Sequence, residues 1–179
     1  MKIVTHYPLV DELLSAYSGE VSHDFTGYSN HVYRLLNFFA ALTHSRGRLP
    51  DAVLIAAVFH DIGIWTASTF DYLEPSIAQA KRHIVTTRDD ATAPEVTALI
   101  ANHHKIRTYE GAFADSVQPF KQADLIDVSL GMLRHGLPRS YVSEVRNAFP
   151  NAGFHRRLLG LALTQCVHEP LRPFPMLRW

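Results

Sequence analysis

The stretch that decides the fold is Ala56-Ala57-Val58-Phe59-His60-Asp61-Ile62-Gly63. Apolar residues run almost without interruption from Ala52 to Phe59, a pattern that indicates a helix buried on most sides. The sequence predicts that Gly63 ends this helix in a left-handed conformation. His60 and Asp61 would then lie in the interior, where an unpaired carboxylate is strongly unfavourable. Adjacent imidazole and carboxylate groups suit a divalent first-row transition metal, so further ligands are expected elsewhere in the chain.

Composition narrows the class of protein. The chain has 179 residues, of which 47% are hydrophobic and 19% charged, as expected for one globular domain over residues 1–179. Lys plus Arg and Asp plus Glu balance at 17 each, so no basic surface for a nucleic-acid polymer or a membrane is expected. Cys166 is the only cysteine, which excludes a disulfide framework and a thiolate metal cluster. No apolar stretch is long enough to span a bilayer, and we expect a cytoplasmic protein.

Periodicity and turn residues predict an all-α fold. We expect helices near residues 9–17, from Ser29 or Asn30 to about 44, from 51 to 62, and from Pro75 to about 85. A capping box of Thr92 and Glu95 predicts a helix from 92 to about 104. Further helices are expected at about 118–133, 138–149 and 152–167.

Histidine and aspartate side chains fall on or beside the apolar faces of five of these helices. His31 precedes Leu35 by four residues, and His103 continues a stripe that includes Ile100. The residues expected to face inward are His31, His60, Asp61, His83, His103 and Asp124, with His104 as an alternative to His103. A second His-Asp dipeptide, His23-Asp24, follows no apolar helix and is interpreted as part of a loop.

Helical bundles build metal sites from one or two ligands on each of several facing helices. Each buried polar group left without a partner would cost roughly 1–3 kcal/mol. One or two bound divalent ions would satisfy the whole set, and the sequence therefore predicts a metal centre.

The order of these ligands resembles a known family. His31, His60-Asp61 and Asp124 on successive helices resemble the HD superfamily of metal-dependent phosphohydrolases. His60-Asp61-Ile62-Gly63 matches its signature dipeptide and usual continuation, and His83 and His103 resemble its two-metal members. The resemblance covers residues 28–130 approximately and implies an HD-type helical bundle, with the C-terminal helices at 138–168 outside the motif. A Gly-Tyr-Pro triplet and an early Lys, typical of members that cleave cyclic dinucleotides, are missing.

The resemblance implies a role for each ligand. His31, His60, Asp61 and Asp124 would hold the first metal, and Asp61 would bridge to a second metal held by His83 and His103. His104 is an alternative ligand or a group that orients phosphate. The metal identity is open among Fe, Mn, Co, Ni, Zn and Mg.

The expected activity is hydrolysis of a phosphate ester, such as a nucleotide or a small phosphometabolite, by metal-activated water. Asp61, or a nearby group such as His104, would accept the proton. The residues expected to contact substrate are Arg34, Lys105, Lys121, Trp65 and Tyr72.

Three alternatives use the same ligands. A di-iron centre would activate dioxygen, and a hydratase or hydrolase would act on a small non-phosphate substrate. A non-catalytic protein would use the metal for stability or ligand binding, with the C-terminal helices as a homodimer face.

Overall fold

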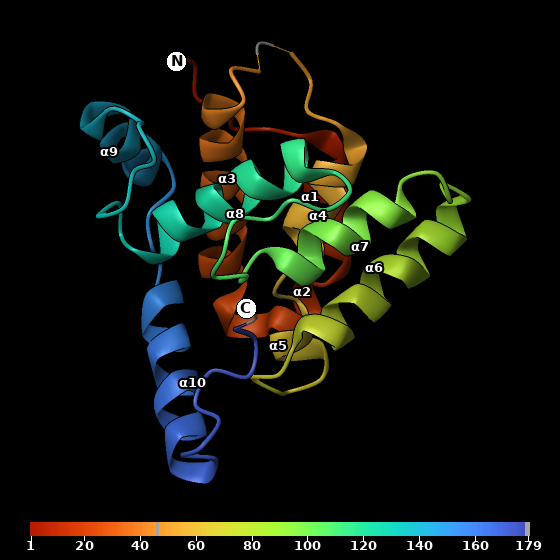
Figure 1. Ribbon diagram of the computed structural model, residues 1–179, viewed down its shortest axis with the longest axis vertical. Coiled ribbons are helices and arrows are strands. Elements are labelled where there is room, and N and C mark those ends of the chain that lie inside the picture. Colours follow the sequence, from red (N-terminus) through yellow and green to blue (C-terminus); the bar gives the residue numbers. More distant parts are fainter. Residues whose placement is uncertain (46, 178–179) are drawn as a thin grey trace.

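All regular elements that the computed structural model contains within residues 1–45 and 47–177, the part of the chain that it describes, are helices (Figure 1). The predicted all-α class is therefore confirmed. The elements are α1 Pro8–Ala16, α2 Ser18–Val21, the 3-10 turn η1 Ser22–Asp24, α3 Phe25–Leu42, α4 Asp51–Phe59, α5 Gly63–Thr66, α6 Leu73–Thr87, α7 Ala93–Asn102, α8 Ala114–Val128, α9 Arg139–Ala148 and α10 Phe154–His168. Among these described helices, none combines the length and the apolar character that crossing a bilayer requires.

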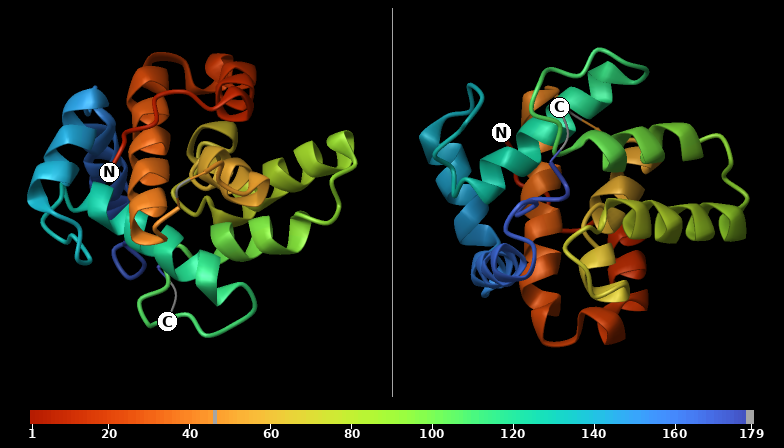
Figure 2. Two further views of the ribbon diagram at one scale, coloured as in Figure 1. Left: turned by 90° about the horizontal axis from the view of Figure 1, so that it is seen from above. Right: turned by 60° about the horizontal axis from the view of Figure 1, so that its bottom comes forward.

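The arrangement places α3 and α8 at the centre, crossing one another (Figure 1). The paired helices α6 and α7 extend to one side, and α4 packs against α1, α6 and α7. On the other side of α3 lie α9 and α10, as the two views in Figure 2 also show. The site described below lies where the inner faces of α3, α4, α7 and α8 meet.

Helix α4 is buried along its length because its apolar residues leave no polar face. Every residue from Ala52 to Phe59 is at most 3% exposed. His60 and Asp61 follow in a right-handed turn, so both side chains remain inside. The left-handed stop predicted at Gly63 is wrong, because Gly63 begins α5 and is absent from the positive-φ residues of the described chain. A Cβ at Gly63 would lie 2.5 Å from the carbonyl oxygen of Tyr72, so glycine permits a close approach there.

Two helix starts and one predicted capping interaction also differ from prediction. Helix α3 begins at Phe25, ahead of the expected caps, and the Asn30 side chain instead donates to the carbonyl of Pro150 at 2.7 Å. Helix α8 begins at Ala114, ahead of the expected start near Gln118, and contains Pro119 in its interior. Thr92 precedes α7, but its hydroxyl donates to the carbonyl of Asp89 at 2.9 Å and forms no side-chain cap.

Candidate metal centre

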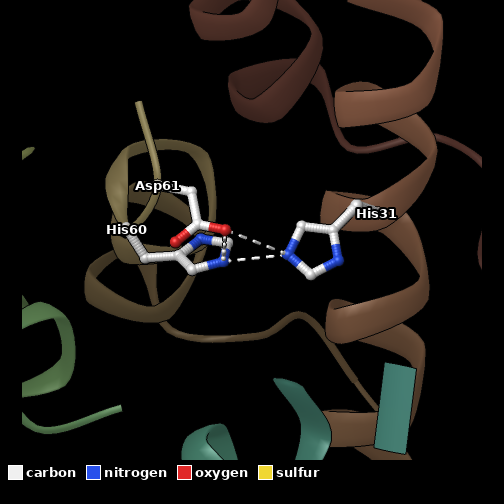
Figure 3. Close-up of side chains that lie close together, drawn as sticks. All are labelled: His31, His60 and Asp61. Carbon is white, nitrogen blue, oxygen red and sulfur yellow. Dashed lines mark hydrogen bonds and ion pairs between the residues drawn. The ribbon is translucent and has the colours of Figure 1, made fainter. Parts of the chain in front are cut away.

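Four helices bring histidine and aspartate side chains to one buried point. His31 comes from α3, His60 and Asp61 from the end of α4, and Asp124 from α8. His103, directly after α7, lies beside Asp61. All five side chains belong to residues that are at most 3% exposed. Figure 3 shows the His31 and His60 rings pointing their nitrogens at one another beside the Asp61 carboxylate.

The hydrogen bonds of the imidazoles decide which nitrogen is free. His60 Nδ1 lies 2.8 Å from the carbonyl oxygen of Ala57, and His103 Nδ1 lies 2.8 Å from that of Ile100. A carbonyl oxygen only accepts, so both Nδ1 atoms carry the proton and donate. His31 Nδ1 donates in the same way to Asp127 Oδ2 at 2.7 Å. A neutral ring with its proton on Nδ1 presents an Nε2 lone pair to the centre, the form in which histidine binds a metal.

The inward-facing atoms are close to one another. His31 Nε2 lies 2.9 Å from His60 Nε2, 3.7 Å from Asp61 Oδ2 and 3.5 Å from Asp124 Oδ1. His60 Nε2 lies 3.4 Å from Asp61 Oδ2 and 3.9 Å from Asp124 Oδ1. Two lone pairs facing each other at 2.9 Å repel unless a positive charge lies between them. The arrangement thus requires a proton or a cation at its centre.

These separations fit the coordination sphere of a first-row divalent ion. Ligands bound at about 2.1 Å are separated by about 3.0 Å in an octahedron and about 3.4 Å in a tetrahedron. The His31 and His60 nitrogens lie 2.9 Å apart and 3.4–3.9 Å from the Asp61 and Asp124 oxygens, distances that span these values, and the ligand atoms of His31, His60 and Asp61 all lie within 4.8 Å of one another. Two imidazole nitrogens and two carboxylate oxygens are also the donor set preferred by Fe, Mn, Co, Ni and Zn.

The second oxygen of Asp61 faces a different pair of imidazoles. Asp61 Oδ1 lies 3.5 Å from His103 Nε2, too far for a good hydrogen bond, and both atoms are buried without a hydrogen-bond partner. Asp61, His103 and His104 offer ligand atoms within 4.8 Å of one another, as do His31, His60 and Asp61. The His104 ring packs on that of His103 at a centroid distance of 3.9 Å, and its Nε2 is 2.6 Å from the hydroxyl of Tyr72. Asp61 thus has one oxygen toward each group, which is the geometry of a bridging carboxylate.

Burial and charge keep the donors in the forms that bind metal. Burial lowers the pKa of His60 to about 3, so its ring is neutral near pH 7. Burial alone would raise the pKa of Asp61, but the imidazoles of His60 and His103 hold that pKa below its ordinary value. Burial raises the pKa of Asp124 to about 6, an effect opposed by His31 and His103. Metal binding requires deprotonated ligands, and the shifts of His60 and Asp61 favour that form, whereas the Asp61 carboxylate outweighs burial and raises the pKa of His103.

Asp127 supports the site from behind, a role that sequence reasoning missed. Its carboxylate accepts the His31 Nδ1 proton and forms a two-point ion pair with Arg34, with Nε 2.5 Å from Oδ1 and Nη2 2.8 Å from Oδ2. Arg34 also donates from Nη1 to the carbonyls of Phe149 and Pro150. A carboxylate behind a ligating histidine fixes its tautomer and ring orientation.

Arg34 is therefore a correction to the predicted substrate contacts. It was expected to contact substrate, but it is 1% exposed and its guanidinium is bound to Asp127 and two carbonyls. The matched i,i+3 spacings of His31 with Arg34 and of Asp124 with Asp127 are the sequence signal that could have indicated this support.

His83 does not reach the cluster, which corrects the predicted ligand set. Its ring stacks on that of Phe59 at a centroid distance of 5.7 Å, and the residue is partly exposed. Successive residues of a helix point about 100° apart, so a ring packed on Phe59 cannot share the side on which His60 lies. His104, which the sequence offered as an alternative to His103, lies beside both His103 and Asp61.

Of the other predicted substrate contacts, Trp65 and Tyr72 pack against the core and Lys105 lies at the edge of the centre. Trp65 donates from Nε1 to Asp24 at 3.0 Å and packs against Tyr28, so it covers the core. Tyr72 is 3% exposed and lies in a small apolar cluster with Ile64, Phe70, Leu73 and Met176. Lys105 is half-buried just after His104.

Lys121, the remaining predicted phosphate contact, donates to the carbonyl of Arg107 at 2.7 Å. The His23-Asp24 dipeptide lies outside the cluster, as expected, with Asp24 paired to Trp65 and Arg157.

The fold and the site define a helical protein with a buried histidine and aspartate cluster. Comparison of the chain with family models, with curated proteins and with solved structures gives no match. The resemblance to HD phosphohydrolases therefore depends on the residues of this chain alone.

Proposed function

We propose that this protein is a divalent-metal-dependent phosphohydrolase that acts on a small phosphate ester. The observation that carries the proposal is the pair of Nε2 lone pairs of His31 and His60, held 2.9 Å apart by protons fixed on the opposite ring nitrogens. A shared proton would also relieve the repulsion between these lone pairs, but the two neighbouring carboxylates and the unpartnered Asp61 Oδ1 and His103 Nε2 favour a divalent ion. A cation between the rings explains the arrangement.

The chemistry of the donor set favours hydrolysis. A bound divalent ion would lower the pKa of a water molecule toward neutrality and polarise a phosphoryl oxygen. His31, His60, Asp61 and Asp124 would hold a first ion, and the free Asp61 Oδ1 with His103 would hold a second. His104 lies beside this pair, and its Nε2 accepts a hydrogen bond from the Tyr72 hydroxyl, whose pKa burial raises well above its ordinary value.

The remaining residues orient the ligands and exclude water. Asp127 fixes His31, and the carbonyls of Ala57 and Ile100 fix His60 and His103. Burial strengthens every electrostatic interaction in the centre, because little water screens it.

The test measures bound metal and phosphate release together. Protein loaded with Mn, Co, Ni, Zn, Mg or ferrous iron is assayed against nucleoside monophosphates and p-nitrophenyl phosphate, and metal is counted by mass spectrometry. Asp61→Asn should remain folded, lose metal and lose activity. His83→Gln, which changes a histidine outside the cluster, should keep both.

Two outcomes would count against the proposal. Loaded protein that releases no phosphate from any of these compounds excludes a general phosphohydrolase. Two bound irons with substrate-dependent uptake of dioxygen, and no phosphate release, would favour the oxygenase alternative on the same ligands.

A further inference from the structure

A cavity separate from the metal centre gathers positive charge. It has a volume of about 540 Å³ and is lined by residues of α9, of the loop after α8 and of the segment from 149 to 155. Four of its lining residues are arginines: Arg34, Arg134, Arg139 and Arg146. No Asp or Glu is among the residues that line it. The cavity shares no residue with the five-residue centre, and its size matches that of sites for small ligands.

Most of the positive charge in this cavity has no acidic partner within the part of the chain that the structure describes. Arg34 forms the floor and is neutralised by Asp127, but none of the ion pairs found among the described residues involves Arg134, Arg139 or Arg146. Arg146 donates from Nη1 to the carbonyl of Leu130, which ties α9 to the opposite wall and leaves its charge unpaired. The chain as a whole is balanced at 17 basic and 17 acidic residues, so this concentration of positive charge is local.

The periodicity of α9 separates this wall from the core. Tyr141, Val142 and Val145 are buried, and the side chains of Arg139, Ser143 and Arg146 line the cavity at spacings of four and three residues. Ser143 and the neighbouring amides of the lining add neutral hydrogen-bond donors. Guanidinium groups arranged around a concave surface are the usual way in which proteins bind phosphate groups.

We propose that this cavity is a binding site for a small phosphate-bearing anion. The proposal does not depend on the phosphohydrolase activity. The floor of the cavity connects to the metal centre through Arg34, Asp127 and His31, so an occupant would contact the group that supports a proposed metal ligand.

The test uses inorganic phosphate as the probe, in calorimetric titrations of the whole protein in a chloride buffer. The informative variant is Arg134→Gln with Arg139→Gln, since both side chains are exposed and neither supports the core. Its matched control is Arg82→Gln with Arg88→Gln, which removes the same charge from exposed positions on and after α6. Asp61→Asn separates this cavity from the metal centre. Circular dichroism verifies that each variant is folded.

Saturable binding to the wild type is expected, with unchanged affinity in Asp61→Asn and in the control pair. The affinity should fall at least about tenfold in the Arg134 and Arg139 pair, because two charge-assisted hydrogen bonds are lost. Binding that disappears in Asp61→Asn would place the anion at the metal centre and overturn the proposal. Equal affinities in the two double variants, or no saturation at roughly 20 mM phosphate, a weak limit for specific binding, would also overturn it.

Discussion

Replacing Asp127 with asparagine should destabilise the protein strongly, although Asp127 is not a proposed metal ligand. Asp127 is fully buried and accepts hydrogen bonds from both His31 and Arg34. The variant keeps the size of the side chain but leaves the guanidinium of Arg34 buried without its counter-charge. Removing one partner of a buried pair costs about 3–5 kcal/mol. For a domain of this length, each kcal/mol corresponds to about 2–4 °C, so the melting temperature should fall by about 6–20 °C.

The stability lost in Asp127→Asn should depend on pH in one direction. Burial would raise the pKa of Asp127, but the hydrogen bonds from His31 and Arg34 outweigh it and hold the pKa below its ordinary value. A depressed carboxyl pKa contributes stability that is fully present above the unfolded pKa, near 4, and is lost as the pH falls toward the folded pKa. The difference between wild type and Asp127→Asn should therefore be constant at neutral pH and shrink below about pH 4.

Urea denaturation at several pH values measures this difference. The combined variant Arg34→Met with Asp127→Leu provides the matched comparison, because replacing both partners by apolar residues leaves no buried charge without a counter-charge. The double variant should lose less stability than the sum of the losses measured for Arg34→Met alone and for Asp127→Leu alone. A cost below about 1 kcal/mol for Asp127→Asn, or a cost that grows at acid pH, would refute a buried charged pair at this position.

Three further predictions concern the metal and the packing around it. Gly63→Ala should cost about 1–3 kcal/mol in urea denaturation, because its Cβ would meet the Tyr72 carbonyl, whereas Gly160→Ala, with open space around it, should cost nothing. His103→Gln should reduce the metal content of the purified protein, while His83→Gln should leave it unchanged. Removing metal with a chelator should lower the melting temperature, since a ligand at about a hundred times its Kd contributes about 2.7 kcal/mol.

Local periodicity was sufficient to predict the residues that face the interior. The unbroken apolar run of α4 identified His60 and Asp61 as buried, and the stripes of α3, α7 and α8 did the same for His31, His103 and Asp124. For these five residues the pattern of their own helix was enough, whereas the same reasoning placed His83 inside although it is partly exposed.

Contacts between side chains on different helices could not be predicted from periodicity. Arg34 was expected to contact substrate, and its actual partners, Asp127 and the Phe149 carbonyl, could not be predicted because they lie 93 and 115 residues further along the chain. His83 is next to the buried Ile84, and only the packing of α6 on α4 shows that its ring meets Phe59. Long-range packing therefore determined both corrections.

The burial of the centre has a consequence for the rate at which a bound metal ion would be released. Its five residues, His31, His60, Asp61, His103 and Asp124, are at most 3% exposed, and Met176 packs with Tyr72 beside His104. An ion in this position could leave only when packed side chains separate, so its escape would be governed by an opening motion of the protein. The rate at which a chelator strips the metal should then reach a plateau as chelator concentration rises, and shortening the Met176 side chain should raise that plateau.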